Sequence, residues 1–343
     1  RHLGAHADAN SGGEIDVALR AGFAPSDIVF TGVGKTPDEL ARAVTLGVKA
    51  INVESDGEAA RIDELARARG VRARVALRVN PDIDPQTHHH ISTGVRATKF
   101  GVPADHVPAL LRDLSHRPGL EPVGLHVHLG SQIKDMAPVA RAARLLVDLA
   151  SDARQHGIQL EHVDLGGGLG ISYDGSPEPN AETYADAILR SVRDSGFHLL
   201  LEPGRFLVGP AGALVGRVSD IKAYPGSPRF LVLDTGMTEL IRPMLYEAYH
   251  RIVAVTPRGG PEATYDVVGP LCETSDTLGR DRAFSPVEVG DLMAILDTGA
   301  YGNVMASNYN RRCMPAEVLV DQGAWQVIRR RQTIDDMLRL EEL

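Results

Sequence analysis

The chain is poor in cysteine, in aromatic residues and in long apolar runs. Its 343 residues include two cysteines, Cys272 and Cys313, and one tryptophan, and 5% of them are aromatic. Two cysteines cannot form a disulfide framework, so we expect a reducing, cytoplasmic environment. No apolar run approaches the roughly 20 residues that cross a bilayer, so we expect no membrane segment.

Positive charge is also scarce. The 36 Lys and Arg residues are outnumbered by 45 Asp and Glu residues, which gives a formal net charge of -9. Without a basic stripe to neutralise phosphates, nucleic acid is not expected as a partner.

The length of the chain allows two domains. Arg1 is not an initiator Met, and the first ten residues do not resemble a signal peptide, so we expect a fragment of a longer chain.

Up to about residue 207, short apolar runs alternate with amphipathic stretches. Seven runs are predicted to be strands: residues 5–9, 28–31, 50–53, 75–79, 124–128, 160–165 and 199–202. Helical periodicity predicts helices between them, among others at residues 36–45, 56–69, 137–156 and 181–195. This alternation is typical of a parallel α/β sheet. Because a (β/α)8 TIM barrel has eight units, we predict for residues 1–207 a barrel whose first unit is missing.

After residue 207 the pattern changes. Strand-like, β-branched runs occur at residues 213–224, 229–233, 265–268, 291–296 and 317–320. They are separated by Gly, Pro and Asp, and no long helical period divides them. The pattern predicts a second, mainly antiparallel β domain over residues 208–343. Residues 333–343 fit a short amphipathic helix at best.

Three motifs lie where predicted strands end. They are His128-Leu-Gly-Ser131, Gly166-Gly167-Gly168 and Glu202-Pro203-Gly204-Arg205. Glycines after a strand let the backbone approach an anion, an imidazole can stack on a ring, and a carboxylate can keep a pyridinium nitrogen protonated. Pyridoxal phosphate is the cofactor that fits this set best. Taken singly, the glycines could form a tight turn and Glu202 a surface salt bridge.

Other motifs are weaker signals. His126 and His128 share a strand face, as in metal-binding barrels, but the later strand ends carry the glycines and Glu202 instead of an obvious ligand set, so no metal is expected. The three histidines at residues 88–90 read as a loop without metal. The segment from Phe30 to Thr36 resembles a P-loop but has Val29 at the first glycine position. We therefore expect Lys35 to be a surface residue at a helix start.

Together and in this order, these motifs resemble the alanine-racemase-like (fold type III) pyridoxal-phosphate decarboxylases. Within that group the chain is similar to the diaminopimelate decarboxylases, which make L-lysine. The resemblance spans almost the whole chain. Further matching pieces are Thr93-Gly94 with Lys99-Phe100-Gly101, residues 241–246 with Tyr249 and His250, and residues 272–276, 299–302 and 315–320.

The resemblance implies a role for each matching residue on the cofactor side. His128 would stack on the pyridine ring, and Glu202 would pair with its nitrogen. Asp8 and Glu14 match cofactor-side positions less closely. The phosphate would be held by Ser131, Gly166, Gly167, Gly168 and the backbone of Pro203, Gly204 and Arg205, with Tyr301 also reaching it.

The resemblance also implies roles on the substrate side. Cys272 would be the proton donor. Cys272 and Glu273 would enter the active site of a partner subunit, which implies a head-to-tail homodimer with shared sites. The substrate would be contacted by Arg205, Arg242, Tyr246, Glu273 and Tyr301.

Two departures from the family pattern bear on these expectations. The lysine to which the cofactor is normally attached would precede the Ser11-Gly-Gly-Glu14 match, and none of the lysines in this chain lies in a matching context. Residues 310–314 replace an Arg-Pro pair that is more common in the family. The alternatives are therefore a decarboxylase of another basic amino acid or carboxylated polyamine, and a non-catalytic regulatory relative.

Overall fold

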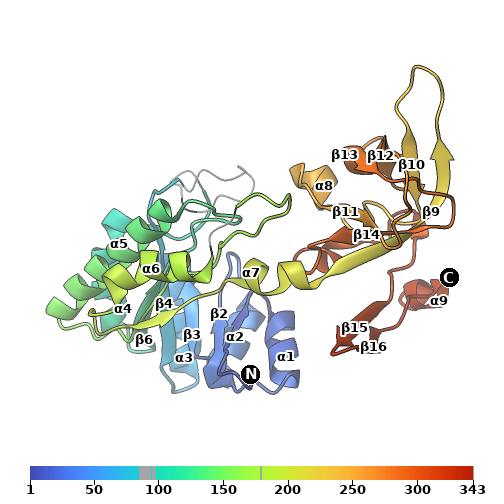
Figure 1. Cartoon of the computed structure of the whole chain (residues 1–343). Helices are drawn as coiled ribbons and strands as arrows, with labels where there is room; N and C mark the ends of the chain where they lie inside the picture. Colours follow the sequence, from blue (N-terminus) through green and yellow to red (C-terminus); the bar gives the residue numbers. More distant parts are fainter. Residues whose placement is uncertain (85–93, 95–97, 178–179, 343) are drawn as a thin grey trace. The chain divides into compact units, whose positions relative to one another are not determined.

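The computed structural model describes residues 1–84, 94, 98–177 and 180–342 (Figure 1). The three histidines at residues 88–90 lie outside these residues. The chain forms two compact units. The first comprises residues 1–170 and 178–203, and the second comprises residues 171–177 and 204–343.

A parallel sheet forms the centre of the first unit. Its strands follow one another in chain order: β1 (Ala7–Ala9), β2 (Ile28–Phe30), β3 (Ala50–Val53), β4 (Ala73–Asn80), β6 (Leu120–His126), β7 (His162–Asp164) and β8 (His198–Leu200). Every neighbouring pair on this path is parallel. The short β5 (Val102–Pro103) pairs with the end of β4. The seven predicted strands are confirmed, and within the described residues the sheet is an open half-barrel that ends at β1 and β8.

Helices connect these strands. They are α1 (Gly12–Arg20), α2 (Pro37–Leu46), α3 (Asp56–Ala68), α4 (Val107–His116), α5 (Met136–Gln155) and α6 (Ala181–Val192). Thr36 caps α2 through a capping box with Glu39, and Gly47 ends the helix in the left-handed conformation at φ 66°. These signals explain why the predicted and observed bounds of α2 nearly coincide. None of the helices in the described residues is long and apolar enough to cross a membrane.

The expectation that Lys35 lies on the surface is wrong. Its side chain is 2% exposed, and its Nζ donates to the carbonyl oxygens of Gly32 and Asn52, each at 2.7 Å. The same Nζ lies 3.3 Å from both carboxylate oxygens of Glu58. Burial lowers the pKa of Lys35, whereas the charge of Glu58 opposes that effect. The buried ammonium group thus links the end of β2 to β3 and α3.

The second unit is built on a six-stranded sheet. Its strands are β9 (Ala213–Lys222), β10 (Phe230–Leu233), β11 (Ile252–Ala254), β12 (Ala263–Val268), β13 (Thr277–Phe284) and β14 (Leu292–Leu296), in the order β11-β14-β9-β10-β12-β13. β10 and β12 are parallel and the other pairs are antiparallel. The predicted, mainly antiparallel β structure is confirmed. Short helices α7 (Gly204–Val208), α8 (Arg242–Tyr246) and α9 (Ile334–Leu338) complete this part.

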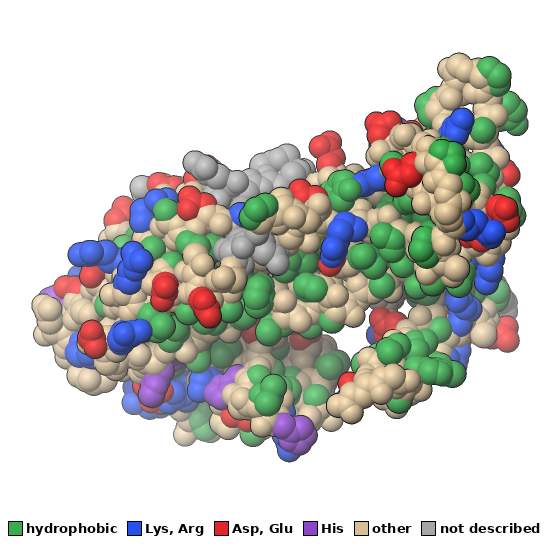
Figure 2. Space-filling view, in the orientation of Figure 1, with side chains coloured by type: hydrophobic (Ala, Val, Ile, Leu, Met, Phe, Trp, Pro, Cys, Tyr) green, Lys and Arg blue, Asp and Glu red, His purple; other side chains and the backbone are tan. Residues whose placement is uncertain are grey.

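A separate hairpin of β15 (Glu317–Asp321) and β16 (Ala324–Arg329) exposes apolar side chains. Figure 2 shows hydrophobic side chains gathered at the surface of this hairpin. Six large side chains are between 46% and 72% exposed: Val318, Leu319, Val320, Trp325, Val327 and Ile328. So dense an apolar surface on one short hairpin is typical of an interface with another surface.

Candidate active site

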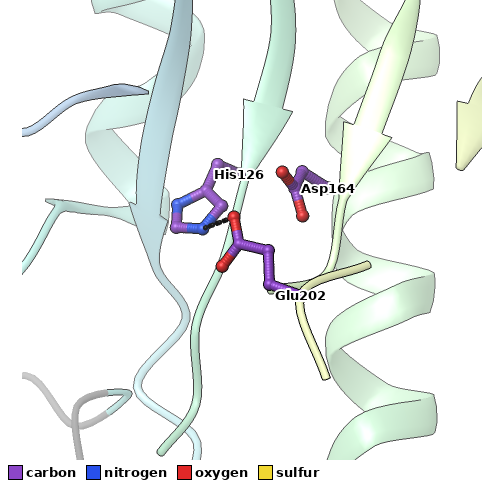
Figure 3. A group of neighbouring side chains, drawn as sticks. All are labelled: His126, Asp164 and Glu202. Carbon is purple, nitrogen blue, oxygen red and sulfur yellow. Dashed lines mark ion pairs between the residues drawn. The ribbon is translucent and has the colours of Figure 1, made fainter. Parts of the chain in front are cut away.

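Three side chains meet at the carboxyl end of the parallel sheet (Figure 3). His126 is the last residue of β6, Asp164 is the last residue of β7, and Glu202 follows β8. Parallel strands end at the same sheet edge, so neighbouring strands bring these groups together. Nε2 of His126 lies 3.5 Å from Oε1 of Glu202, and ligand atoms of all three groups lie within 4.8 Å of one another. The sequence pattern alone did not indicate Asp164 as a member of this cluster.

His126 and Asp164 are buried, Glu202 is partly buried, and the cluster holds more acid than base. Burial, together with the charge of Asp8, raises the pKa of Glu202 to about 8. Burial and the neighbouring charge of Glu202 raise the pKa of Asp164 well above its usual range. Burial lowers the pKa of His126, so its imidazole is neutral at pH 7. The raised pKa values mean that the two carboxyl groups hold their protons more tightly than usual. A cation or a protonated nitrogen beside them would favour their ionised forms.

Polar atoms of the cluster lack hydrogen-bond partners among the described residues. Oε1 of Glu202 and both ring nitrogens of His126 are buried and make no hydrogen bond there. A protonated pyridine nitrogen would supply the positive donor that Glu202 lacks, so the residues fit pyridoxal phosphate. The same three groups could also hold a metal ion, for which the sequence suggested too few ligands.

The triple-glycine turn joins three strand ends. Gly166 has a φ of 63°, and Gly168 has a φ of 103°. A Cβ on Gly167 would lie 2.1 Å from the carbonyl oxygen of Glu202, and one on Gly168 would lie 2.3 Å from that of Gly130. The N–H of Gly166 donates to Oδ1 of Asp164 at 2.9 Å. Only glycine allows the backbone to come this close to the strand ends.

The turn also fixes His128. The N–H of Gly167 donates to Nδ1 of His128 at 3.1 Å, so in a neutral ring the hydrogen is on Nε2. Burial, with the charge of Arg78 and the neighbouring imidazole of His126, lowers the pKa of His128 to about 3. A neutral imidazole held at one edge has a fixed ring plane, which suits stacking on a flat ring. The N–H groups of Gly166 and Gly167 are used inside the protein, which the sequence could not show.

Arg78 is a further charged group of this site, and no sequence motif indicates it. Its NH1 donates to Oε1 of Glu54 at 2.6 Å, and its guanidinium lies 4.6 Å from the ring centre of Phe100. Oε2 of Glu54 accepts from the N–H of Gly101 at 2.8 Å. The charge of Arg78 also lowers the pKa of Glu202, partly offsetting burial. Its neighbours in space lie 22 to 24 residues away along the chain, so no local pattern indicates it.

Asp8 and Glu14 lie near the first strand. Asp8, on β1, accepts from the hydroxyl of Thr31 at 2.8 Å and from the amide of Asn10 at 3.0 Å. Its charge raises the pKa of Glu202, so Asp8 belongs to the electrostatic surroundings of the cluster. Glu14 lies in the first turn of α1 and accepts from the N–H of Asn10 at 2.6 Å.

The second unit contains two buried arginines of the predicted set, Arg205 on α7 and Arg242 on α8. NH1 of Arg205 donates to the hydroxyl of Tyr173 at 2.6 Å. The guanidinium of Arg205 also lies 4.7 Å from the ring centre of Tyr301, a residue with a φ of 57°. NH1 of Arg242 lies 2.7 Å from Nε2 of His250. Burial lowers the pKa of Arg242, and no carboxylate pairs with this arginine in the described part of the chain.

Cys272 and Glu273 lie on a loop between β12 and β13. Cys272 is exposed, and the amide of Asn310 lies 3.5 Å from its sulfur. The hydrogen bond between Tyr309 and Glu273 raises the pKa of Tyr309. Tyr246 ends α8, the helix that begins at Arg242. The structure thus places the predicted substrate-side residues in the second unit.

Known proteins resemble almost the whole chain. Residues 1–209 match the family described as pyridoxal-dependent decarboxylase, pyridoxal binding domain. The diaminopimelate decarboxylase of Neisseria meningitidis serogroup A is 44% identical over 339 residues, covering 99% of this chain and 83% of the relative. That of Zymomonas mobilis is 44% identical over 343 residues, covering 99% and 80%. The crystal structure of diaminopimelate decarboxylase from Helicobacter pylori complexed with L-lysine has a TM-score of 0.95 at 39% identity, covering 99% and 85%.

With this identity over nearly its whole length, and with a buried carboxylate at a strand end that fits a protonated pyridine ring, the chain belongs to the diaminopimelate decarboxylase family of pyridoxal-dependent decarboxylases.

Proposed function

We propose that this protein decarboxylates meso-2,6-diaminopimelate to L-lysine and CO2, and that the strand-end cluster and the two buried arginines carry this reaction. The observation that carries the proposal is the buried carboxylate of Glu202, whose Oε1 has no hydrogen-bond partner among the described residues. Its raised pKa and the nearby Asp164 make it a strong acceptor for a positively charged ring nitrogen.

Pyridoxal phosphate, when bound, supplies an electron-accepting ring to the substrate's α-carbon. Glu202 would keep the proton on the ring nitrogen, and His128 would lie against the ring face. The phosphate would be held by Ser131, the backbone at Gly168, the backbone of Pro203, Gly204 and Arg205, and Tyr301. The N–H groups of Gly166 and Gly167 already donate to Asp164 and His128, so these two glycines would shape the turn and not bind the anion directly. The turn can take this position only because its residues are glycines, since a Cβ on Gly167 or Gly168 would clash with the carbonyl oxygen of Glu202 or Gly130.

Arg242 and Glu273 would select the substrate. Arg242 is a buried cation without a carboxylate partner in the described residues, so it suits the substrate's distal carboxylate. Glu273 would meet the distal amine with the opposite charge, beside Tyr246. A ligand without that carboxylate would leave Arg242 unpaired and desolvated. Cys272, on the same loop as Glu273, would donate the proton that replaces the departing carboxylate.

A substrate panel tests this function. With pyridoxal phosphate present, CO2 release by the protein produced from its complete coding sequence would be followed with meso-diaminopimelate, L-lysine, L-ornithine and L-arginine at equal concentrations. We expect release from meso-diaminopimelate with formation of L-lysine. Release from one of the other three amino acids, and not from meso-diaminopimelate, would overturn the substrate assignment while leaving the cofactor assignment standing.

We also propose a homodimer in which each subunit supplies Cys272 and Glu273 to its partner's site. The exposed Cys272 and the apolar surface of the β15–β16 hairpin support it. Sedimentation should give twice the chain mass, and mixing inactive Cys272→Ala and Glu202→Gln subunits should restore part of the activity. A monomer that is fully active at low concentration would exclude shared sites.

The two free cysteines support a reducing, cytoplasmic location.

A further inference from the structure

Tyr173 occupies an unusual place in the chain. It lies in residues 171–177, which belong to the second unit although the residues on both sides belong to the first. Its side chain is buried, with 7% of the residue exposed. Nothing in the proposed function uses it. Its surroundings are the two arginines of the second unit and His250.

One aromatic ring contacts both arginines in different ways. The hydroxyl of Tyr173 accepts a hydrogen bond from NH1 of Arg205 at 2.6 Å. The guanidinium of Arg242 lies over the face of the same ring, 4.5 Å from its centre. The ring face carries negative potential and the hydroxyl oxygen carries a lone pair, so both contacts favour a cation. The tyrosine therefore stabilises two like charges that would otherwise repel each other.

His250 completes the arrangement. It is fully buried, and its ring packs edge-on against Tyr173, with 4.9 Å between ring centres and 69° between ring planes. Nδ1 lies 2.8 Å from the carbonyl oxygen of Leu296, so Nδ1 carries the hydrogen. Nε2 is then an acceptor, and it receives a hydrogen bond from NH1 of Arg242 at 2.7 Å. Arg242 is thus held on one side by an imidazole and on one face by a phenol ring.

We propose that Tyr173 and His250 are positioning residues that hold the guanidinium of Arg242 in place for the substrate's distal carboxylate, and that Tyr173 couples Arg242 to Arg205. This inference rests on the proposed function, because it assigns the distal carboxylate to Arg242. Neither residue is required to touch the substrate. They keep the buried guanidinium of Arg242 in one orientation, so that ligand binding does not carry the entropy cost of fixing this side chain.

A pair of ligands isolates this contribution. L-lysine retains the carboxylate of the distal end of the substrate, whereas cadaverine has the same amines and no carboxylate. Calorimetric binding of both ligands to the cofactor-loaded protein gives an affinity ratio that depends on the carboxylate. We expect Tyr173→Phe, which loses the hydroxyl contact to Arg205, to reduce the ratio by about tenfold. We expect Tyr173→Leu, which also loses the ring face, to reduce it by about 100-fold.

Variants of His250 test the other side of Arg242. His250→Gln keeps an acceptor and should retain most of the ratio, whereas His250→Phe removes the acceptor and should reduce it by about tenfold. Tyr265→Phe, a change at another buried tyrosine of the second unit, should leave the ratio unchanged. In turnover with meso-diaminopimelate, the change should be mainly in KM.

The outcomes separate this inference from the proposed function. If the wild-type protein fails to release CO2 from meso-diaminopimelate, the proposed function is overturned. If it is active and prefers L-lysine to cadaverine, but Tyr173→Leu and His250→Phe lower both affinities equally, the residues are structural only and the inference is overturned. If His250→Phe does not fold, Tyr173→Phe and Tyr173→Leu decide alone.

Discussion

Oε1 of Glu202 lies 3.5 Å from Nε2 of His126, with Asp164 on the neighbouring strand end. This relationship places an imidazole and a second carboxyl group beside the carboxylate that is proposed to pair with the cofactor ring. Since burial raises the pKa of Glu202 to about 8, a positive partner is needed for it to be fully ionised at pH 7. The cluster therefore holds the carboxylate ready for a protonated nitrogen.

Replacing Glu202 with Gln should abolish most turnover. The amide has the same shape but cannot hold a proton on the ring nitrogen, so we expect kcat to fall by about 10²–10³-fold, the scale for one lost electrostatic contact in a buried site. Steady-state kinetics at saturating cofactor would measure it. Glu161→Gln serves as the control, because that glutamate is half exposed and pairs with Arg74. A kcat equal to that of the wild type would remove Glu202 from the mechanism.

Replacing Glu273 with Ala should remove substrate turnover and leave cofactor binding intact. The carboxylate is proposed to meet the distal amine, so its loss should reduce kcat/KM for meso-diaminopimelate by about 100-fold. Cofactor binding would be followed by fluorescence in the same samples. The exposed Glu262, changed to Ala, is the matched control. An unaltered kcat/KM would contradict the role assigned to Glu273.

Replacing Lys35 with Met should destabilise the fold strongly. The change leaves the carboxylate of Glu58 buried without its counter-charge, which costs about 3–5 kcal/mol in the free energy of unfolding. Urea denaturation would measure this loss. A Lys35→Met, Glu58→Leu double variant should recover much of it, because neither charge then remains, and the exposed Lys222→Met should change little. A single Met variant as stable as the wild type would mean that the ion pair contributes nothing.

Replacing Gly167 with Ala should disrupt the site. An added Cβ would meet the carbonyl oxygen of Glu202 at 2.1 Å, so the ends of β7 and β8 would have to separate. We expect cofactor affinity to fall by at least about tenfold together with stability. Gly259→Ala is the control, since no atom lies within 4 Å of the added Cβ. Cofactor titration measures both affinities, and equal cofactor affinity of Gly167→Ala and Gly259→Ala would contradict this prediction.

Buried neutral histidines should make stability depend on pH. Burial lowers the pKa of His162 to about 4, against about 6.5 in an unfolded chain. Between these values the unfolded chain binds more protons, so the contribution of His162 is complete above pH 6.5 and is lost as pH falls toward 4. The raised pKa of Glu202 has the opposite effect on how stability changes with pH. The contribution of His162 is therefore measured as the difference between the wild type and a variant that lacks this histidine.

Urea unfolding between pH 7 and pH 4.5 should therefore show a steeper loss for the wild type than for His162→Phe. The difference in slope should approach about 1.4 kcal/mol per pH unit, the value for one proton. His116→Gln, at an exposed histidine, should keep the wild-type slope. Parallel curves for the wild type and His162→Phe would show that folding does not lower the pKa of His162.

Much of the fold could be predicted because its signals are local. The seven parallel strands follow from short apolar runs, and Thr36, Pro37 and Gly47 mark the ends of α2. β13 was missed because Gly279, Arg280, Asp281 and Arg282 interrupt its apolar pattern. Its strand conformation depends on pairing with β12, which no periodicity in its own sequence reveals.

The site could be predicted only where residues act from recognisable motifs. His128, the triple glycine and Glu202 lie just after strand ends, as their motifs predicted, and the cofactor-binding roles expected of them stay predictions. Lys35 was misplaced because its partner Glu58 is 23 residues away in the sequence. Tyr173 and Arg78 were missed for the same reason: a buried side chain acquires its role from contacts that are distant along the chain.

The chain passes between its two units three times, after Gly170, Pro177 and Pro203. A hybrid enzyme made by recombination at the last of these junctions would inherit its arginines from one parent and Tyr173 from the other. Where the two parents differ at position 173, we expect exchange to preserve the contacts of Tyr173 with both arginines only if residues 171–177 are transferred with the C-terminal part. In that case residues 171–177 and 204–343 would have to be exchanged together.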